Sequence, residues 1–322
     1  MAQRFSSGNA LLHFARTDGP RGFVWKYLLT YAAFAILLMG VGYALFQPVF
    51  NLVFRAILSA AQGASEREVE AIFTRRLTEL IGWIVLANIV MLFLGALFWA
   101  VFEAAVQRRY VREEGFSVRL GGDELRLLLV GLIWFAFSVA AYILSLVVIA
   151  SGTGVLVMAL DNPRGGGFAI LGAMLMVALV WVWIVVRLAP ASAMTIRDRK
   201  VTFFGAWGAT KGRFWQLVWA YVGLALMIVL MLFLANMVFG TAIVASFMAN
   251  IERLTSAADS GNPLTLLSAL LQFDILAPVL TAWLGWLMLQ GLIQYMWAGP
   301  AALAAKTDPR GGGIAQAPDV FA

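Results

Sequence analysis

The stretch FFGAWGATKGRFWQLVWAYV, residues 203–222, places cations among aromatic rings: Lys211 and Arg213 lie between Trp207 and Trp215. A long apolar segment follows directly. Ammonium and guanidinium groups attract lipid phosphates, and tryptophan rings prefer the boundary between hydrocarbon and water. These residue types and their spacing predict contact with anionic lipid headgroups. The alternative is a topological anchor that holds the chain at the membrane surface without recognising a particular lipid.

Other basic residues extend this prediction, because they also lie directly before or after a long apolar run. Juxtamembrane cations contribute about 1 kcal/mol each toward an anionic membrane surface. The residues predicted to contact lipid are Arg112, Arg119, Arg126, Arg197, Arg199, Lys200, Trp207, Lys211, Arg213, Trp215 and Trp219.

The sequence lacks the residues that covalent catalysis, metal binding or nucleotide binding would need. Cysteine is absent and His13 is the single histidine, so no zinc site is expected. The segment GATKGR lacks the spacing and the ending of a phosphate-binding loop. With no catalytic triad, paired acids or nucleotide fingerprint, we expect no catalytic residue, no metal site and no cofactor other than bound phospholipid. The net charge of +6 does not predict nucleic-acid binding, since the basic residues cluster where membrane orientation requires them.

A few uncharged polar side chains fall inside the apolar runs. Gln290 and Gln294 are four residues apart and share one helix face, where they can hydrogen-bond to a neighbouring helix. Together with Asn88 and Asn236, they are instead candidates for the lining of a cavity. The structural interpretation is favoured, and the cavity stays an alternative.

Charged side chains are absent from the centres of the apolar runs. Glu103 and Arg187 fall near the ends of two runs, where we expect their side chains to reach water. Ion-coupled transport usually requires charged groups deep within the membrane. Their absence argues against coupled transport but leaves passive movement of an apolar solute open.

The composition is that of a membrane protein. Of 322 residues, 62% are hydrophobic and only 12% are charged, and the mean hydropathy is +0.87. Six runs are long enough for the roughly 20 apolar residues that cross a bilayer, and they are apolar on every face, as helices in lipid are. We therefore predict an all-α, polytopic domain over residues 1–305, followed by a disordered cytoplasmic tail, 306–322. The predicted spans are about 26–47, 80–102, 127–150, 168–189, 214–246 and 275–298.

The distribution of Lys and Arg predicts the orientation. Most of them lie on the side of the membrane that carries both termini, so both termini are expected to be cytoplasmic. The loops 47–78, 151–167 and 247–270 are then expected to face outward. In the first of these loops, Ser65 and Glu68 form the pattern of a capping box, which predicts the start of a helix.

The same plan occurs three times along the chain. Each time a short polar and aromatic segment precedes a span going out, an outer loop and a span returning. Three such units of like orientation would be parallel two-helix repeats around an axis along the membrane normal. The alternative is that any six-helix membrane protein alternates in this way.

Two regions of the chain resemble known membrane proteins. IRDRKVTFFGAWGATKGRFWQLVWAYV resembles the tryptophan, Thr-Lys-Gly, Phe-Trp signature of the membrane-domain family associated with glycerophosphodiester phosphodiesterases and its stand-alone bacterial relatives. YVREEGFSVRLGGDELRLLLVGL and VVRLAPASAMTIRDRK look like segments of uncharacterised alphaproteobacterial six-helix inner-membrane proteins. The resemblance covers about residues 100–220 and implies a helical inner-membrane protein, without an activity to transfer. The phosphodiesterase catalytic domain, a soluble α/β barrel, has no counterpart in this chain.

These observations favour a non-enzymatic, multi-pass protein of the bacterial inner membrane. It is expected to bind anionic membrane lipids and to organise or assist a membrane-protein partner. One alternative is a transporter or channel for a lipid-like or small apolar solute. Another is an accessory subunit of a larger membrane complex.

Overall fold

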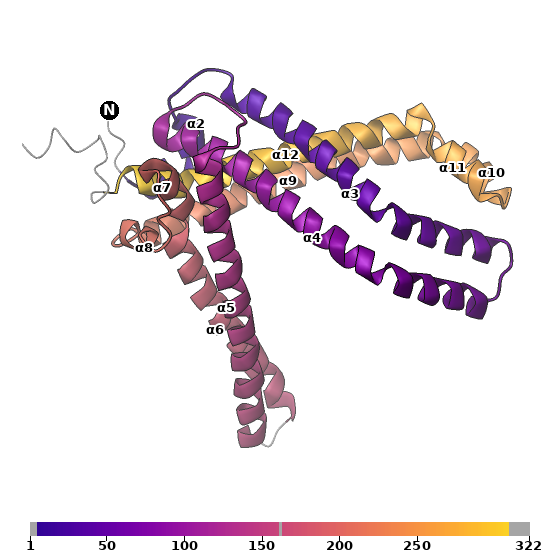
Figure 1. The fold of residues 1–322 in the computed structure, drawn as a ribbon, viewed down its shortest axis with the longest axis horizontal. Helices are drawn as coiled ribbons and strands as arrows, with labels where there is room; N and C mark the ends of the chain where they lie inside the picture. The colour runs from indigo at the N-terminus through magenta and orange to yellow at the C-terminus, as the bar shows by residue number, and fades with distance from the viewer. Residues whose placement is uncertain (1–4, 161–162, 309–322) are drawn as a thin grey trace, which may run out of the picture. The chain divides into compact units, whose positions relative to one another are not determined.

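The computed structural model describes residues 5–160 and 163–308, and the elements in this part of the chain are all helices (Figure 1). Six of these helices are long and apolar enough to cross a membrane. The predicted all-α, polytopic fold is therefore confirmed. The six long helices are α3 (Phe23–Ala61), α4 (Glu66–Arg112), α5 (Gly122–Leu160), α6 (Pro163–Leu188), α9 (Phe214–Ala249) and α12 (Phe273–Lys306). The short helices are α1 (Ser7–Leu11), α2 (His13–Arg16), α7 (Ala191–Asp198), α8 (Ala206–Ala209), α10 (Ile251–Asp259) and α11 (Pro263–Leu270).

The long helices extend beyond the predicted spans, because hydropathy marks only the part of a helix that suits hydrocarbon. Helix α4 has 47 residues, which at 1.5 Å per residue is roughly 70 Å, more than twice the thickness of a hydrocarbon core. Its first turn is closed by the predicted capping box. The Ser65 N–H donates to Glu68 Oε2 at 2.9 Å, and the Glu68 N–H donates to Ser65 Oγ at 3.4 Å. The predicted outer loop 47–78 is consequently mostly helical.

The other two predicted outer loops also contain helix. Helix α5 continues past Ser151, whose hydroxyl donates to the Val147 carbonyl at 2.7 Å and so needs no partner outside its own helix. Residues 247–270 contain α10 and α11, and the Asn262 side chain caps α11 by accepting from the Leu264 N–H at 3.0 Å. Residues 309–322, most of the predicted disordered tail, lie outside the described residues.

Two compact units divide the chain. Unit 1 comprises residues 1–23, 99–225 and 294–322, and unit 2 comprises residues 24–98 and 226–293. Helices α3, α4, α9 and α12 contribute residues to both units, whereas α5 and α6 belong to unit 1 alone.

Unit 2 is held together by close contacts between helices at small residues. Ala32 and Ala35 of α3 pack with Leu287 of α12. A side chain at Gly285 of α12 would place its Cβ 2.3 Å from the ring of Phe239 on α9. Small residues at such positions let helices approach closely, which is how van der Waals packing associates helices in lipid. These glycine and alanine positions therefore define the helix contacts of unit 2.

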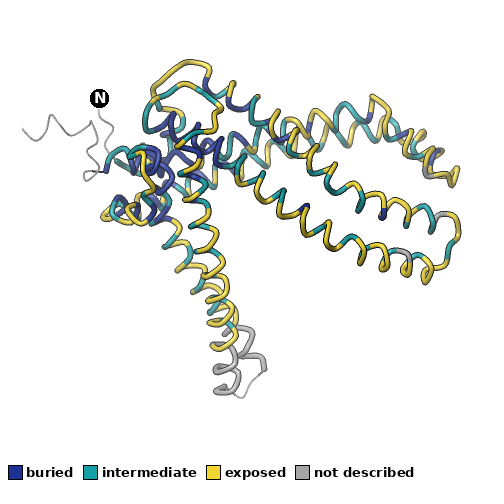
Figure 2. The backbone as a smooth tube through the Cα atoms, viewed as in Figure 1, coloured by how far each residue is buried: buried dark blue, intermediate teal, exposed yellow. Residues whose placement is uncertain are grey.

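Unit 1 contains most of the buried residues, shown dark blue in Figure 2. Ala104 of α4, Leu127 of α5 and Ile196 of α7 belong to one cluster. A second cluster joins Leu217 of α9 and Ala304 of α12, together with Val186 of α6. The short helices and loops of unit 1 thus connect the ends of the long helices through a packed core.

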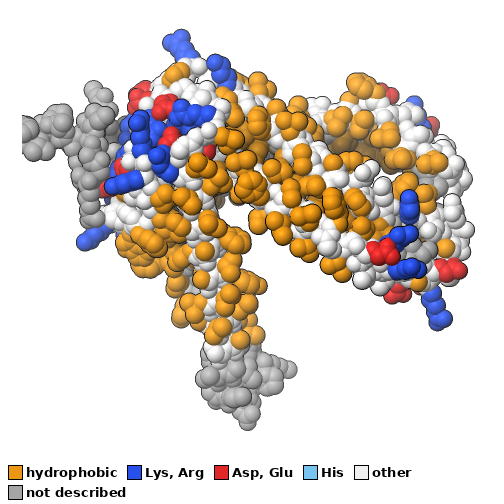
Figure 3. Space-filling model, in the orientation of Figure 1, with side chains coloured by type: hydrophobic (Ala, Val, Ile, Leu, Met, Phe, Trp, Pro, Cys, Tyr) orange, Lys and Arg blue, Asp and Glu red, His pale blue; other side chains and the backbone are white. Residues whose placement is uncertain are grey.

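Three helical hairpins follow one another along the chain: α3 with α4, α5 with α6, and α9 with α12. Their order matches the three predicted two-helix units, while common ancestry of the hairpins stays a prediction. On the face drawn in Figure 3, hydrophobic side chains cover the part of the α5–α6 hairpin that is not grey, and Lys and Arg gather where this hairpin begins in unit 1. The charged chemistry of unit 1 is concentrated at that end of the hairpin.

Candidate functional site

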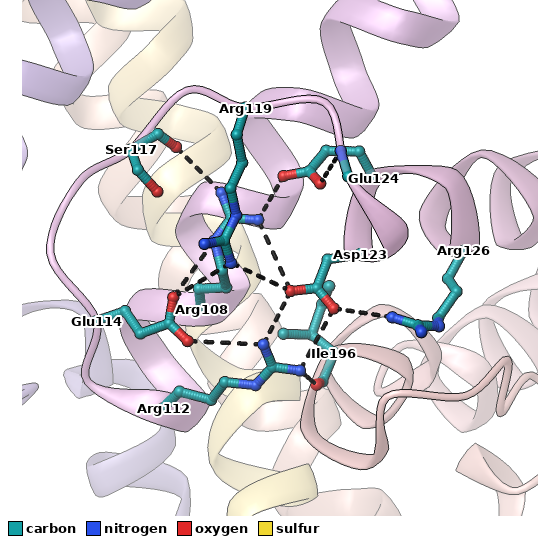
Figure 4. A network of polar contacts seen from close by, with 10 residues as sticks. Arg108, Arg112, Glu114, Ser117, Arg119, Asp123, Glu124, Arg126 and Ile196 are labelled. Atoms are coloured by element: carbon teal, nitrogen blue, oxygen red, sulfur yellow. Dashed lines mark hydrogen bonds and ion pairs between the residues drawn. The ribbon is translucent and has the colours of Figure 1, made fainter.

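A dense group of charged side chains lies in unit 1 where α4 ends, in the loop that follows, and where α5 begins. We call this group the Asp123 network, and Figure 4 shows how its members point toward one another. Basic residues in the last turn of α4 and acidic residues in the first turn of α5 suit the helix dipoles at those ends. The members of the network are Arg108, Arg112, Glu114, Arg119, Asp123, Glu124 and Arg126.

The Asp123 carboxylate is shared by three arginines that were predicted to contact lipid. Arg112 Nη1 lies 2.8 Å from Asp123 Oδ2, and Arg119 Nη2 lies 3.5 Å from the same oxygen. Arg126 Nη1 lies 3.1 Å from Asp123 Oδ1. Arg112 also donates to the Ile196 carbonyl and thereby ties α4 to the end of α7. These three cations are therefore engaged within the protein.

The same network contains a fully buried ion pair between Arg108 and Glu124, each only 1% exposed. Arg108 Nη2 donates to the Ser117 carbonyl at 3.0 Å, and the Gly121 N–H donates to Glu124 at 2.9 Å. Buried charges persist only when they are paired and hydrogen-bonded. The network therefore fixes the shape of the α4–α5 loop.

Two further predicted lipid contacts hold the end of α12. Arg197 pairs with Asp198 at 2.6 Å and donates to the Ala305 carbonyl. Arg213 donates to the hydroxyl and the carbonyl of Thr307 at 2.8 Å and 2.9 Å. These contacts favour a structural role for both arginines.

A third cation, Lys306, fastens the same end of α12 by pairing with Glu113 at 2.6 Å. This hydrogen bond and the charge of Lys306 lower the pKa of the Glu113 carboxyl. Lys306, Arg197 and Arg213 together join the end of α12 to three other segments of unit 1.

The remaining predicted cations are exposed. Arg199, Lys200 and Lys211 form no ion pair with the carboxylates of the described residues. They lie in the segment that leads from α7 to α9, residues 199–219, which we call the hinge segment. The tryptophans predicted to contact lipid belong to it as well, and Trp215 and Trp219 are 69% and 63% exposed. The hinge segment thus presents free positive charge beside exposed aromatic rings.

An open cavity of about 620 Å³ lies where α7, α8 and the end of the described chain meet. Lys200 and Phe204 line it together with Gly205 and Gly208, and Asp198 and Asp308 are also among its lining residues. Arg197 lines it too, although its guanidinium is already paired with Asp198. Lys200 is therefore the cation of this cavity that lacks an acidic partner in the described part of the chain.

The polar residues predicted to line a cavity lie in separate places. Asn88 and Asn236 are exposed, and each donates to a carbonyl of its own helix at 2.8 Å. Gln290 is exposed on α12 in unit 2. Gln294 lies in unit 1 and donates to Glu103 at 3.4 Å. These contacts match the structural interpretation, and the polar cavity stays a prediction.

The surroundings of two charged residues, Glu103 and Arg187, differ from what the sequence predicted. Glu103 was expected to reach water, but that prediction is wrong because its side chain is buried and accepts from Gln107 at 2.7 Å. Arg187 stands among aromatic rings, with its guanidinium carbon 6.0 Å from Trp183 and 5.2 Å from Phe214. Trp183 and Arg187 are four residues apart on one helix, a spacing that brings side chains together. That spacing was the available signal for Arg187.

The side chains that could bind a metal ion are scattered in the part of the chain that the structure describes. There, no group of three or more His, Cys, Asp and Glu side chains is placed to hold a metal ion. His13 is 2% exposed and its ring lies 5.2 Å from that of Tyr110. Burial lowers the pKa of His13 to about 4, aided by Lys306 and opposed by Glu113. The ring is therefore neutral at physiological pH.

No protein-family model, curated protein or solved structure significantly matches the chain. The resemblance of the hinge segment to the phosphodiesterase-associated membrane family therefore stays a prediction from the residues.

Proposed function

We propose that this multi-pass protein binds anionic phospholipid through the hinge segment and is not an enzyme. The observation that carries the proposal is the division of its cations into two classes. The arginines of the Asp123 network face carboxylates, whereas Lys200 and Lys211 are exposed and unpaired among the described carboxylates. An unpaired cation is available to an external anion, whereas a paired one must first give up the carboxylate that it already faces.

The aromatic residues of the hinge segment support a lipid surface as the source of that anion. Phe204 is 71% exposed, and the rings of Trp215 and Trp219 are exposed to a similar degree. Aromatic rings are enriched at the membrane interface, and an exposed group of them next to cations suits the headgroup region. A soluble anion would make no use of these rings.

The proposed localisation follows from the same charges. Free cations of the hinge segment would lie in the cytoplasmic leaflet of the bacterial inner membrane, and both termini would be cytoplasmic. By holding anionic lipid at this position, the protein would organise or assist a membrane-protein partner. The family resemblance of residues 196–222 is consistent with such a location.

Native mass spectrometry of the purified full chain tests the proposal. We expect Lys200→Gln with Lys211→Gln to lower the number of retained phosphatidylglycerol molecules. The matched control, Arg119→Gln with Arg126→Gln, removes the same charge from the Asp123 network and should leave retention close to that of the unmodified protein. Equal losses in the two double variants, with both folded, would reduce the effect to net charge and contradict the assignment.

One alternative function is favoured by a specific feature. An apolar cavity of about 390 Å³ lies between α6 and α9 in unit 1, and Val185, Val218 and Val222 are among its lining residues. Such a cavity suits a lipid-like or small apolar solute. Transport of a fluorescent phospholipid between leaflets of vesicles containing the protein would support this alternative.

A further inference from the structure

Arg187 lies at the end of α6, where four groups from three segments surround its guanidinium. The ring centroids of Trp183, Trp207 and Phe214 lie 6.0, 5.7 and 5.2 Å from its guanidinium carbon. Arg187 Nη1 donates to the Thr210 carbonyl at 3.2 Å. Aromatic faces attract a guanidinium and hold it in one plane, but they carry no net charge. The positive charge of Arg187 is positioned by these contacts without being neutralised.

An acidic partner such as those of Arg108, Arg112 and Arg197 in the same unit is missing here. No carboxylate of the described residues lies within ion-pair distance of Arg187, and its Nε atom is buried without a hydrogen-bond partner among them. Arg108, of comparable position at the end of α4, is paired with Glu124. The position of Arg187 in the last turn of its helix accounts for part of its stability. It does not account for an unneutralised cation beside a cavity.

That cavity has a volume of about 580 Å³ and is bounded by the end of α6 and the start of α9. Arg187 lines it with Trp183, Gly212, Trp215 and Gln216, and none of its lining residues is acidic. The ends of two predicted spans meet there, so the cavity lies at the level where a membrane presents its phosphate groups. Its volume falls within the usual range for small-ligand sites.

The apolar cavity of about 390 Å³ begins one turn away on the same two helices. Val182 precedes Arg187 on α6 by five residues, and Val218 follows Phe214 on α9 by four, so both lead away from the helix ends that bound the first cavity. Trp297 of α12 lines this second cavity as well. A cationic cavity at headgroup level and an apolar cavity deeper between the same helices match the two ends of a phospholipid.

We propose that α6 and α9 form a specific phospholipid site, in which Arg187 binds the headgroup phosphate and the apolar cavity receives an acyl chain. The planar guanidinium can donate two hydrogen bonds to one phosphate, and the aromatic rings fix its orientation. The inference rests on the proposed lipid binding but uses other residues than Lys200 and Lys211. It predicts one tightly held lipid in addition to the weaker lipids at the hinge segment.

The experiment is a titration of the delipidated full chain with phosphatidylglycerol and with phosphatidylcholine, followed by native mass spectrometry. We expect Arg187→Gln to weaken the tightest phosphatidylglycerol site by about tenfold or more, as expected for a lost charged hydrogen bond. Arg187→Lys keeps the charge without the planar group and should fall between. Ala225→Phe, which fills the apolar cavity, should weaken both lipids. Arg119→Gln is the charge-matched control and should leave the tight site intact.

A competition experiment with a soluble phosphate ester distinguishes a lipid ligand from a free phosphate ester. Glycerol phosphate at millimolar concentration should neither displace the tight lipid nor raise the melting temperature. If it does both, and Arg187→Gln abolishes both effects, the ligand is a soluble phosphate ester and the lipid assignment falls. Should Arg187→Gln fail to fold, Arg187→Lys and Ala225→Phe decide, and unchanged tight binding in both overturns the site. The Lys200→Gln, Lys211→Gln double variant should lose only the weakly held lipids. That result would support lipid binding by the hinge segment, and it would be independent of the result at Arg187.

Discussion

Arg112 and Asp123 form an ion pair at 2.8 Å that joins the last turn of α4 to the first turn of α5. The same carboxylate also faces Arg119 and Arg126, and Arg108 at 3.9 Å, so a single acidic side chain engages four arginines. This arrangement favours a structural role for the Asp123 network, and the proposal accordingly gives lipid contact to the hinge segment. The Asp123 network and the hinge segment are similarly rich in basic residues. They differ in that the arginines of the network face carboxylates.

Asp123→Asn should destabilise unit 1 severely. The substitution removes the shared charge and leaves buried or half-buried arginines without their partner, which typically costs about 3–5 kcal/mol. Thermal unfolding in detergent checks this. Glu114→Gln is the control, because Glu114 is one-third exposed and its ion pairs of 3.4–3.8 Å are longer. A change at Asp123 no larger than that at Glu114 would contradict the structural role of the network.

Stability should fall as the pH drops from about 6.5 toward 4. An unfolded histidine takes up a proton near pH 6.5, whereas His13 in the folded protein, buried and close to Lys306, has a pKa of about 4. Between these values unfolding binds a proton, so the stability present above pH 6.5 is progressively lost, by about 3 kcal/mol at pH 4.

Melting temperatures measured from pH 4 to pH 8 test this prediction. His13→Phe should flatten the profile between pH 4 and 6.5. Glu113→Gln should not flatten it, because the Glu113 carboxylate raises the pKa of His13, and its own lowered pKa contributes stability that is lost only below the usual carboxyl range. A profile that His13→Phe leaves unchanged would show that another group titrates.

Gly285→Ala should weaken the packing of α9 on α12 in unit 2. The added Cβ would lie 2.3 Å from the Phe239 ring, so the ring or the helix must shift, at a cost of about 1–3 kcal/mol. Gly240→Ala is the matched control on α9, because nothing lies within 4 Å of its Cβ position. There alanine should be neutral or stabilising. Equal melting temperatures for the two variants would argue that the close contact does not contribute to stability.

The absence of cysteine makes the predicted orientation directly measurable with single-cysteine variants. Lys200→Cys should react with a membrane-impermeant maleimide only after the cytoplasmic side is opened. Asp259→Cys in α10 should react from the outside of intact spheroplasts. The reverse pattern would place the hinge segment on the outer face and contradict the proposed localisation.

The sequence was sufficient for the elements whose causes are local. Six apolar runs predicted six long helices, and the Ser65–Glu68 spacing predicted the hydrogen bonds that begin α4. Helix length was predicted less well. The third span was predicted to end at residue 150, but the Ser151 hydroxyl bonds within α5 and the helix continues.

The candidate site was only partly predictable, because its contacts join segments that are distant in the chain. Asp123 is near Arg119 and Arg126 in sequence, yet its pairing with Arg112 depends on how the α4–α5 loop folds. The rings around Arg187 come from α6, α8 and α9. Periodicity and spacing in a sequence describe one helix at a time, so they do not predict contacts between side chains of different segments.

Photo-crosslinking tests the central claim most directly, using a phosphatidylglycerol analogue with a reactive group on its headgroup. The full chain is illuminated in vesicles containing the analogue, and the labelled peptides are mapped by mass spectrometry. We predict labelling of residues 199–219 that falls in the Lys200→Gln, Lys211→Gln variant, where only the part beside Arg187 at residues 212–216 remains, and that is kept in full in the Arg119→Gln, Arg126→Gln variant. Labelling concentrated on residues 108–126, or on the loop 61–66, with residues 199–219 unlabelled would contradict the account.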